Sequence, residues 1–198
     1  MKLKDFLKVT LFVLVLFTIS CAKLSEIKAP LQNFTKAQNQ TGLSLSYGIK
    51  YKVKVVKVID GDTIDVEFQD GSIKRIRMLG VDTPETKTQK NKPYEYDEIT
   101  NLTCLAEWGI KAKNFTSTLY DKYIHIEFDP LAGFKGYYGR YLAYVYYPES
   151  NDFTAELIKK GLARVYTEGT FIKEAEYMSY QMEAMNNKVG LWGACSAG

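Results

Sequence analysis

The chain is 198 residues long, is 46% hydrophobic, and carries 26 Lys and Arg against 23 Asp and Glu, a formal net charge of +3. This length is enough for one domain with its own core together with shorter additional segments. The small net charge excludes recognition of a polyanion by overall charge alone. The single histidine, His125, excludes histidine-pair ribonucleases, Ser-His-Asp hydrolases and most zinc hydrolases.

Residues 1–20 have the pattern of a targeting segment. Lys2, Lys4 and Lys8 give it a positive beginning, and residues 9–19 are apolar but too short to span a bilayer. We therefore expect a signal peptide that is not part of the fold. Its removal takes away three lysines and one aspartate, so the net charge of the remainder is +1. A nucleic-acid partner must accordingly be argued from local charge.

Cys21 follows a run of small residues that resembles a bacterial lipoprotein processing site. We expect Cys21 to carry a lipid that anchors the exported protein in the cell envelope. A cleaved signal without a lipid, which would give a secreted protein, and an uncleaved anchor are the alternatives. Residues 21–50 are polar and predict a lipid-anchor site and tether, part of which could pack as an extra strand.

Three β-rich runs follow, at residues 51–59, 62–68 and 73–77. Branched and aromatic residues enrich them, and Asp70-Gly71 predicts a hairpin between the second and the third. Asp60-Gly61-Asp62 separates the first two. On this stretch alone, its acidic residues are interpreted as turn formers.

Three carboxylates, Asp62, Asp82 and Glu85, follow the ends of predicted strands. Carboxylates that converge repel one another unless a cation lies among them or some of them take up protons. A hard cation such as Ca²⁺ is the simplest partner, because no histidine or cysteine lies nearby in the sequence. An EF-hand is excluded, since Ile64 and Asp65 stand where that loop needs an oxygen ligand and a glycine.

The second half of the chain alternates helical and extended patterns. Residues 86–101 are polar and charged and predict a loop at the mouth of the site that shapes substrate access. A glycine-rich stretch at residues 131–140 is interpreted as a mobile loop. The remaining predicted elements are helices at residues 105–119, 152–161 and 171–187 and strands at residues 123–128, 141–147 and 162–166.

These elements indicate one fold class. Short strands alternate with three helices and with several tight hairpins, and no repeated strand-helix-strand unit is present. We therefore predict a mainly β, α+β domain built on a small closed antiparallel barrel.

Cys104 and Cys195 remain as a pair once Cys21 is set aside. In an exported protein, two cysteines suggest one disulfide, which here would join the first helix to the C-terminal tail. Two free thiols are the alternative.

Three separated motifs resemble the signature of the staphylococcal nuclease (thermonuclease) family. They are Ile59-Asp60-Gly61-Asp62-Thr63, then Arg77 five residues before Asp82-Thr83-Pro84-Glu85-Thr86, and Tyr138-Gly139-Arg140-Tyr141-Leu142-Ala143-Tyr144. The resemblance covers roughly residues 51–192. It implies a five-stranded OB-fold barrel with about three packed α-helices, a nuclease domain at residues 51–193 and a tail at residues 194–198.

The resemblance also implies roles for individual residues. It assigns Asp62, Asp82 and the carbonyl of Thr83 to one Ca²⁺, and Arg77, Glu85 and Arg140 to catalysis. Apart from the resemblance, the glycine-rich stretch offers Tyr137 and Tyr138 as residues that could contact the substrate by stacking on a base or binding a phosphate, with packing as the alternative. The implied products are DNA and RNA fragments with 3′-phosphates, released by a protein that favours single strands and is expected to be a monomer.

Two other functions remain open. The first is a catalytically inactive OB-fold module that only binds nucleic acid, although all five side chains implied for metal binding and catalysis are present. The second is a surface lipoprotein whose barrel serves as an interaction scaffold. The sequence offers only the anchor and the tether in support of it.

Overall fold

The structure, a computed structural model, describes residues 44–195. The expected signal peptide, Cys21, most of the expected tether and the last three residues of the expected tail lie outside the described residues. Between residues 44 and 195, no helix combines the length and the apolar character needed to cross a membrane.

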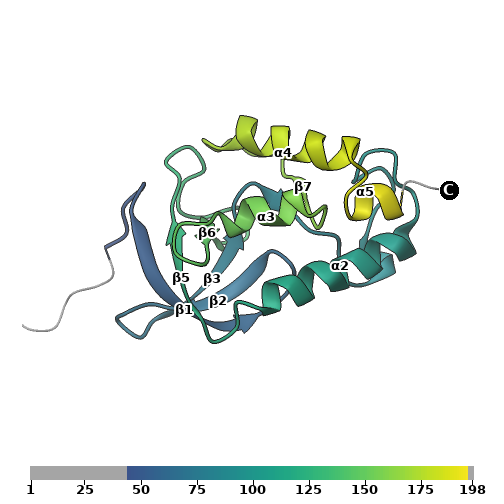
Figure 1. The fold of residues 1–198 in the computed structure, drawn as a ribbon. Coiled ribbons are helices and arrows are strands. Elements are labelled where there is room, and N and C mark those ends of the chain that lie inside the picture. The colour runs from purple at the N-terminus through teal and green to yellow at the C-terminus, as the bar shows by residue number, and fades with distance from the viewer. Residues whose placement is uncertain (1–43, 196–198) are drawn as a thin grey trace, which may run out of the picture. The chain divides into compact units, whose positions relative to one another are not determined.

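Five strands close into a barrel (Figure 1). They are β1 (Lys50–Val58), β2 (Thr63–Glu67), β3 (Ile73–Met78), β5 (Tyr123–Glu127) and β6 (Tyr141–Tyr146). Their order around the barrel is β1-β2-β3-β6-β5, and neighbours are antiparallel except for β3 and β6, which are parallel. This closed five-stranded barrel confirms the predicted OB-type architecture. The prediction that all of its strands are antiparallel was wrong for β3 and β6, which are far apart in sequence and are not joined by a hairpin.

The alternation of apolar residues explains why these strands close. Val53, Val55, Ile64, Val66 and Ile76 are each at most 1% exposed, whereas the residues between them are half-buried or exposed on most of these strands. Side chains point to opposite faces along a strand, so one face of each strand lines the barrel interior. β-branched side chains suit such a pleated, half-buried surface.

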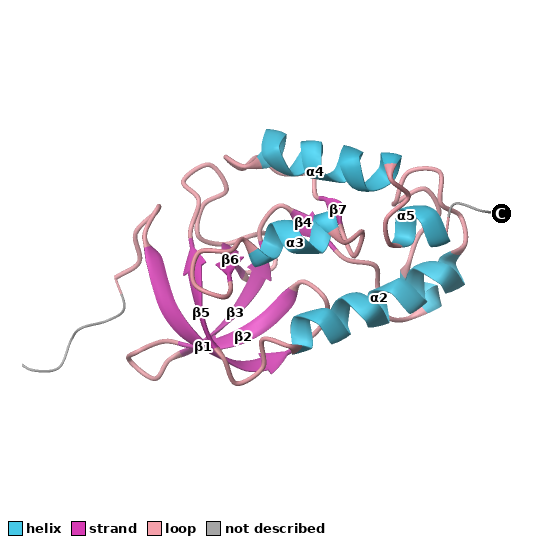
Figure 2. Cartoon of the chain, in the orientation of Figure 1, coloured by secondary structure: helices cyan, strands magenta, loops and turns pink. Residues whose placement is uncertain are grey.

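The helices lie beside the barrel and continue past its end (Figure 2). They are α2 (Leu102–Ser117), α3 (Phe153–Lys159), α4 (Glu174–Asn186) and the short α5 (Leu191–Ala194), with a 3-10 turn at Thr88–Lys90. The side chains of Asn101 and Asp152 begin α2 and α3, because they accept hydrogen bonds from the backbone N–H groups of Cys104 and Ala155. The three predicted helices are confirmed, and α5 is an addition to them.

A second, two-stranded sheet lies between the barrel and the helices. β4 (Val81–Asp82) pairs antiparallel with β7 (Arg164–Val165), and Asp82 stands opposite Arg164. Gly80 links β3 to β4 with a φ of +81°, a conformation that glycine adopts without strain. The sequence predicted a strand around β7 but not its partner.

A small core of its own holds α2, α5 and the segment before α2 together. Its members are buried and apolar: Tyr96, Ile99, Leu105, Ala184, Leu191, Trp192 and Cys195. A disulfide joins Cys104, in the first turn of α2, to Cys195 at the end of α5. Residues 91–101 are therefore a packed part of the domain and not only a surface loop.

The end of the expected tether also packs on the barrel. The Gly48 N–H donates a hydrogen bond to the Phe128 carbonyl at 2.9 Å, and the Tyr47 ring stacks on Phe134 with centroids 4.1 Å apart. The compact unit accordingly begins at Leu45, a few residues before the boundary predicted from the sequence.

Candidate active site

The turn before β2 brings Asp62 against Thr83. A Cβ added to Gly61 would lie 2.7 Å from Thr83 Oγ1, so a glycine is required for this close approach. The Thr116 hydroxyl of α2 donates to the Gly61 carbonyl at 2.6 Å and fixes the turn from the helix side. The Asp-Gly-Asp turn is thus built into the domain interior.

Asp62 is a buried carboxylate that is 5% exposed. Its Oδ1 accepts a hydrogen bond from the Thr63 hydroxyl at 3.0 Å. Its Oδ2 accepts from the Thr83 N–H at 2.9 Å and the Thr83 hydroxyl at 3.0 Å, and lies 2.5 Å from Arg77 Nη1. Charge-assisted contacts of this kind hold a carboxylate in one orientation.

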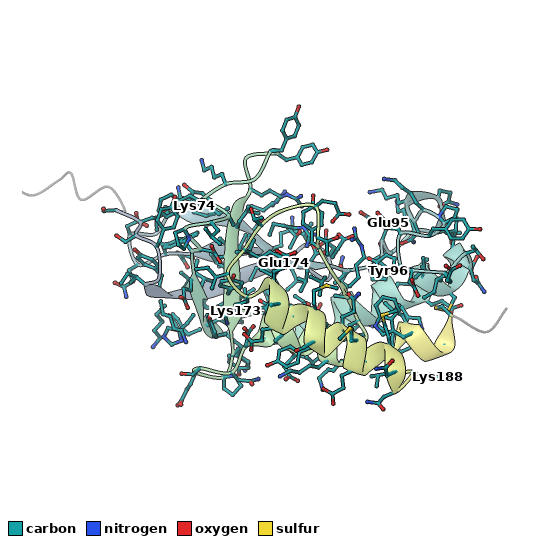
Figure 3. The ribbon with its side chains drawn as sticks, turned by 90° about the horizontal axis from the view of Figure 1, so that it is seen from above. Lys74, Glu95, Tyr96, Lys173, Glu174 and Lys188 are labelled. Carbon is teal, nitrogen blue, oxygen red and sulfur yellow. A yellow bond between two sulfur atoms is a disulfide. The ribbon has the colours of Figure 1, made fainter. Side chains whose placement is uncertain are left out.

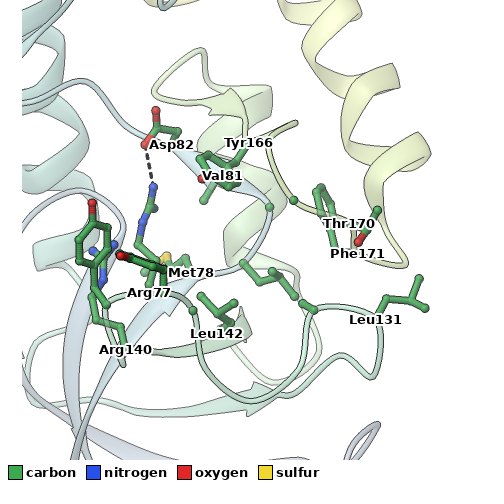
Figure 4. A pocket seen from close by; sticks show the side chains of 17 residues that line it. Arg77, Met78, Val81, Asp82, Leu131, Arg140, Leu142, Tyr166, Thr170 and Phe171 are labelled. Carbon is green, nitrogen blue, oxygen red and sulfur yellow. Dashed lines mark hydrogen bonds and ion pairs between the residues drawn. The ribbon is translucent and has the colours of Figure 1, made fainter.

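Arg77 joins Asp62 to Asp82. Its Nη2 donates to Asp82 Oδ1 at 2.7 Å, the contact drawn as a dashed line in Figure 4. The other oxygen of Asp82, Oδ2, lies 3.0 Å from Arg164 Nη2 and accepts from Arg164 Nε at 3.2 Å. Two carboxylates therefore share Arg77, and Asp82 is shared by two guanidinium groups.

Burial and neighbouring charges both shift the pKa values of the groups in this cluster. It raises the pKa of Asp82 above its ordinary value, although Arg77 and Arg164 act in the opposite direction. Burial and the neighbouring Asp62 raise the pKa of Asp60 to about 6. Burial acts to lower the pKa of Arg77, but the attraction of Asp62 and Asp82 outweighs it and the pKa is raised. The carboxylates of Asp60, Asp62 and Asp82 thus lie in one network with the guanidinium groups of Arg77 and Arg164.

Arg164 is a site residue that sequence reasoning missed. It projects from β7, forms an ion pair with Glu168 at 2.9 Å as well as with Asp82, and lies 5.8 Å from the ring centroids of Tyr96 and Tyr166. The available signal was a basic residue inside a short apolar strand. Without the β4–β7 pairing, nothing in the sequence connected that residue to Asp82.

Glu85 follows β4 in the chain. Its side chain is 52% exposed, and its Oε2 is 3.9 Å from Lys90 Nζ. Its backbone N–H donates to Asn91 Oδ1, and its backbone carbonyl accepts from Asn91 Nδ2, both at 2.9 Å. Glu85 is not among the described residues that line the pocket below, and the ion-pair partner of its carboxylate is Lys90, so the structure does not bring that carboxylate together with Arg77 and Arg140.

Arg140 lies directly before β6 and faces the same region. Its Nη1 is 3.5 Å from Thr63 Oγ1, which links it through Thr63 to Asp62. Tyr138 lies with its ring centroid 5.8 Å from the Arg140 guanidinium carbon. Tyr137 and Tyr138 are 97% and 80% exposed and meet edge to face. These two tyrosines are not core residues, which excludes the packing alternative.

Arg77, Asp82 and Arg140 line one pocket, which has a volume of about 470 Å³. Arg77, Asp82 and Arg140 lie toward one end of it, and Leu131 and Phe171 toward the other (Figure 4). Tyr137, Tyr138 and Tyr166 also line it. The charged end suits an anion, and the apolar end suits a flat or apolar group attached to that anion.

The Ca²⁺ site implied by the resemblance can be tested against this geometry. Between residues 44 and 195, no three His, Cys, Asp or Glu side chains gather as a metal site. The Asp62 and Asp82 carboxylates nevertheless converge on Arg77, and Asp60 accepts a hydrogen bond from the Asp62 N–H beside them. Carboxylate oxygens are hard donors of the kind that a Ca²⁺ ion binds.

The chain is similar to known proteins. Residues 75–194 match the family model described as staphylococcal nuclease homologue. The chain is 32% identical to a thermonuclease of Staphylococcus hyicus over 82% of this chain and 88% of that protein. It is 32% identical to the endonuclease YncB of Bacillus subtilis over 80% of this chain and 71% of that protein. It is 47% identical to an uncharacterized protein of Methanocaldococcus jannaschii over 72% of this chain and 72% of that protein. The chain belongs to the staphylococcal nuclease family.

Proposed function

We propose that the protein is a calcium-dependent nuclease that hydrolyses the phosphodiester bonds of DNA and RNA and leaves 3′-phosphates. The observation that carries this proposal is the convergence of Arg77, Asp82 and Arg140 on one pocket. Buried Asp62 forms an ion pair with Arg77. Membership of a family with relatives named thermonuclease and endonuclease supports the same reaction class.

Arg77 and Arg140 would bind the phosphate. Guanidinium groups match phosphate oxygens with paired N–H donors, and both arginines line the pocket. The Arg77 side chain is 12% exposed and is held by two carboxylates, so its direction is set before substrate arrives. Fixed donors gain strength as negative charge builds on the five-coordinate phosphorus, which stabilises the transition state.

Glu85 would take a proton from the attacking water. The water oxygen forms a bond to phosphorus while the bond from phosphorus to the 5′-oxygen breaks, and the leaving oxygen takes a proton from solvent. The phosphate therefore stays on the 3′ side of the cut. The Glu85 side chain is half-exposed, so a solvent water can reach it.

Asp62, Asp82 and the Thr83 carbonyl would hold the Ca²⁺. When bound, the ion polarises a phosphate oxygen and neutralises charge. Thr83 keeps Asp62 in place through two hydrogen bonds, and Arg164 keeps Asp82 in place. These contacts preserve the orientation of the two carboxylates whether or not the ion is bound.

Tyr137 and Tyr138 would bind the bases of a single strand. Both rings are largely exposed beside the pocket, and any base can stack on them because every base has a π-face. This would give a preference for single strands without a strong preference for sequence. A single chain supplies all of these groups, so we propose that the protein acts as a monomer.

We also propose that the protein is exported and anchored to a membrane through Cys21. The support is the N-terminal sequence, together with a disulfide of the kind that persists in oxidising compartments. Metabolic labelling with palmitate tests the anchor. Label is expected on the wild-type protein and not on Cys21→Ser. A wild-type protein without label would contradict the lipid anchor and favour a secreted protein.

The nuclease proposal is tested by cleavage of single-stranded DNA by the purified protein, with Ca²⁺ and then with excess chelator. Cleavage is expected with Ca²⁺ and not with chelator, and Glu85→Gln is expected to remove most of it while the protein stays folded. Binding of DNA without cleavage would indicate an inactive OB-fold module. If the protein neither binds nor cleaves DNA, the interaction scaffold is the function that remains.

A further inference from the structure

The side chain of Asn91 holds the backbone of Glu85 from two atoms. The Glu85 N–H donates to Asn91 Oδ1, and Asn91 Nδ2 donates to the Glu85 carbonyl, each at 2.9 Å. Asn91 Nδ2 also donates to the Lys87 carbonyl at 3.2 Å. Asn91 is 5% exposed, so its amide group is used by the peptide groups around Glu85 and is shielded from water.

Helix α2 lies against the same peptide. A Cβ added to Gly109 would lie 2.4 Å from the Pro84 carbonyl oxygen and 2.7 Å from the Glu85 carbonyl oxygen. Backbone atoms cannot move aside as the end of a flexible side chain can, so α2 approaches this closely only with glycine at residue 109. The Glu85 peptide is therefore in contact with both α2 and Asn91.

The segment that carries Asn91 is itself anchored. Tyr96 is 1% exposed, and its ring centroid lies 6.4 Å from that of Trp192. Figure 3 shows Tyr96 beside the helices, far from the barrel residue Lys74. The Tyr96 hydroxyl donates to the Asp82 carbonyl at 3.1 Å. One packed segment thus contacts the backbones of both Asp82 and Glu85.

The Glu85 side chain has far weaker restraints than its backbone. It is 52% exposed, and 3.9 Å to Lys90 Nζ is too long for a hydrogen bond. The position of its carboxylate therefore depends on the direction in which the side chain leaves the backbone. That direction is set by the peptide groups that Asn91 binds.

We propose that Asn91 is a positioning residue for Glu85, an inference that rests on the proposed nuclease function. By fixing the N–H and the carbonyl of Glu85, Asn91 sets the point and the direction from which the carboxylate reaches toward the attacking water. A displacement of about 1 Å in a catalytic group costs on the order of 100-fold in rate. The competing interpretation is that Asn91 only satisfies buried backbone groups, which would affect stability alone.

The test compares Asn91→Ala with Asn101→Ala. Asn101 is a matched control, because its side chain also accepts a backbone hydrogen bond, from Cys104 at 3.0 Å, but begins α2 instead of binding Glu85. Asn91→Ala is expected to lower kcat by about 10- to 100-fold. KM for single-stranded DNA and the Kd for Ca²⁺, measured by calorimetry, are expected to stay unchanged. Asn101→Ala is expected to lower Tm and to leave kcat unchanged.

A double variant separates positioning from general loosening. Asn91→Ala acts through the Glu85 carboxylate, so in a Glu85→Gln background it is expected to cause no further loss of rate. Amide hydrogen exchange provides a readout that needs neither metal nor substrate. The Glu85 N–H is expected to exchange slowly in the wild-type protein and in Asn101→Ala, and much faster in Asn91→Ala.

Two results would overturn the inference while leaving the nuclease proposal intact. The first is a normal kcat for Asn91→Ala. The second is a loss of rate from Asn91→Ala that is equally large with and without the Glu85 carboxylate. A wild-type protein that cleaves no nucleic acid would overturn both proposals together.

Discussion

Arg164 engages Asp82 Oδ2 at 3.0 Å, while Arg77 engages Asp82 Oδ1 at 2.7 Å. Both oxygens of Asp82 are thus paired, one with a residue of the barrel and the other with a residue of β7. Opposed charge-assisted contacts leave a carboxylate little rotational freedom. Asp82 is therefore oriented by the fold before any cation binds.

Replacing Arg164 should destabilise the protein in a way that Ca²⁺ partly reverses. Arg164→Ala leaves Asp82 Oδ2 without its guanidinium partner, and the free energy of unfolding should fall by about 1–3 kcal/mol. A bound Ca²⁺ would supply positive charge at the same carboxylate, so the difference from wild type should shrink when Ca²⁺ is added. Chemical denaturation with Ca²⁺ and with chelator measures both values.

Arg75→Ala is the control for that experiment. Arg75 is paired with Asp65 on the barrel surface and is 49% exposed, so its loss should change stability by about 1 kcal/mol or less. Its effect should be the same with and without Ca²⁺. An Arg164→Ala deficit that Ca²⁺ does not reduce would contradict the assignment of Asp82 to the ion.

Asp82→Asn should remove the stabilisation that Ca²⁺ gives. Binding to the native state alone stabilises a protein by about 2.7 kcal/mol when the free ion is at 100 times its Kd. The variant loses one of two anionic ligands, so its Tm should respond weakly to Ca²⁺. Asp70→Asn makes the same charge change at an exposed turn and should retain the full response. Equal responses in the two variants would count against the site.

Reduction of the disulfide should lower stability substantially. Cys104 and Cys195 are 91 residues apart, and a loop of that length corresponds to about 4–5 kcal/mol in the chain-entropy model. Dithiothreitol should therefore lower Tm of the wild-type protein. The double variant Cys104→Ser/Cys195→Ser should show the lower Tm without reductant. A wild-type Tm that does not respond to reductant would indicate two free thiols.

Much of this fold follows from local pattern. The period-two runs predict β1, β2, β3 and β5, because burying one face of a strand requires alternating apolar residues. The role of Asp152 as the first residue of a helix is also predictable, since its side chain competes for the first free N–H groups. Both depend on neighbours in the sequence.

The parts of the site that escaped prediction depend on distant contacts. Arg164 reaches Asp82 across a separation of 82 residues, and its role arises only when β4 pairs with β7. Asn91 is closer in sequence to Glu85, but its interaction requires a segment that folds around Tyr96. The sequence alone indicated a polar loop there, because residues 86–101 are mostly polar and charged. The three that the structure buries, Asn91, Tyr96 and Ile99, follow no period that a strand or helix would give.

Substitution of Asp152 should also lower the free energy of unfolding. Its carboxylate accepts from the Ala155 N–H at 2.9 Å, Lys173 Nζ at 2.6 Å and the Tyr177 hydroxyl at 3.0 Å. Asp152→Ala removes the helix cap and leaves Lys173 Nζ with the Tyr146 hydroxyl as a hydrogen-bond partner but without its carboxylate, which should cost about 1–3 kcal/mol. Asp152→Asn keeps the cap and should cost less. Denaturant unfolding of the two variants measures the difference, and equal losses would show that the cap contributes little.

The exposed ring of Tyr137 gives a test of substrate binding. Tyr137 is 97% exposed and touches the Tyr138 ring, so Tyr137→Ala and Tyr137→Phe should both leave the core undisturbed. If Tyr137 stacks on a base, Tyr137→Ala should weaken binding of single-stranded DNA by about 1–3 kcal/mol, a change of roughly 5- to 150-fold in Kd. Tyr137→Phe keeps the ring and should bind like wild type. Fluorescence anisotropy in the Glu85→Gln background, where cleavage is suppressed, measures both. Equal weakening in Tyr137→Phe would assign the effect to the hydroxyl, which would then bind phosphate, and no change in either variant would remove Tyr137 from the substrate site.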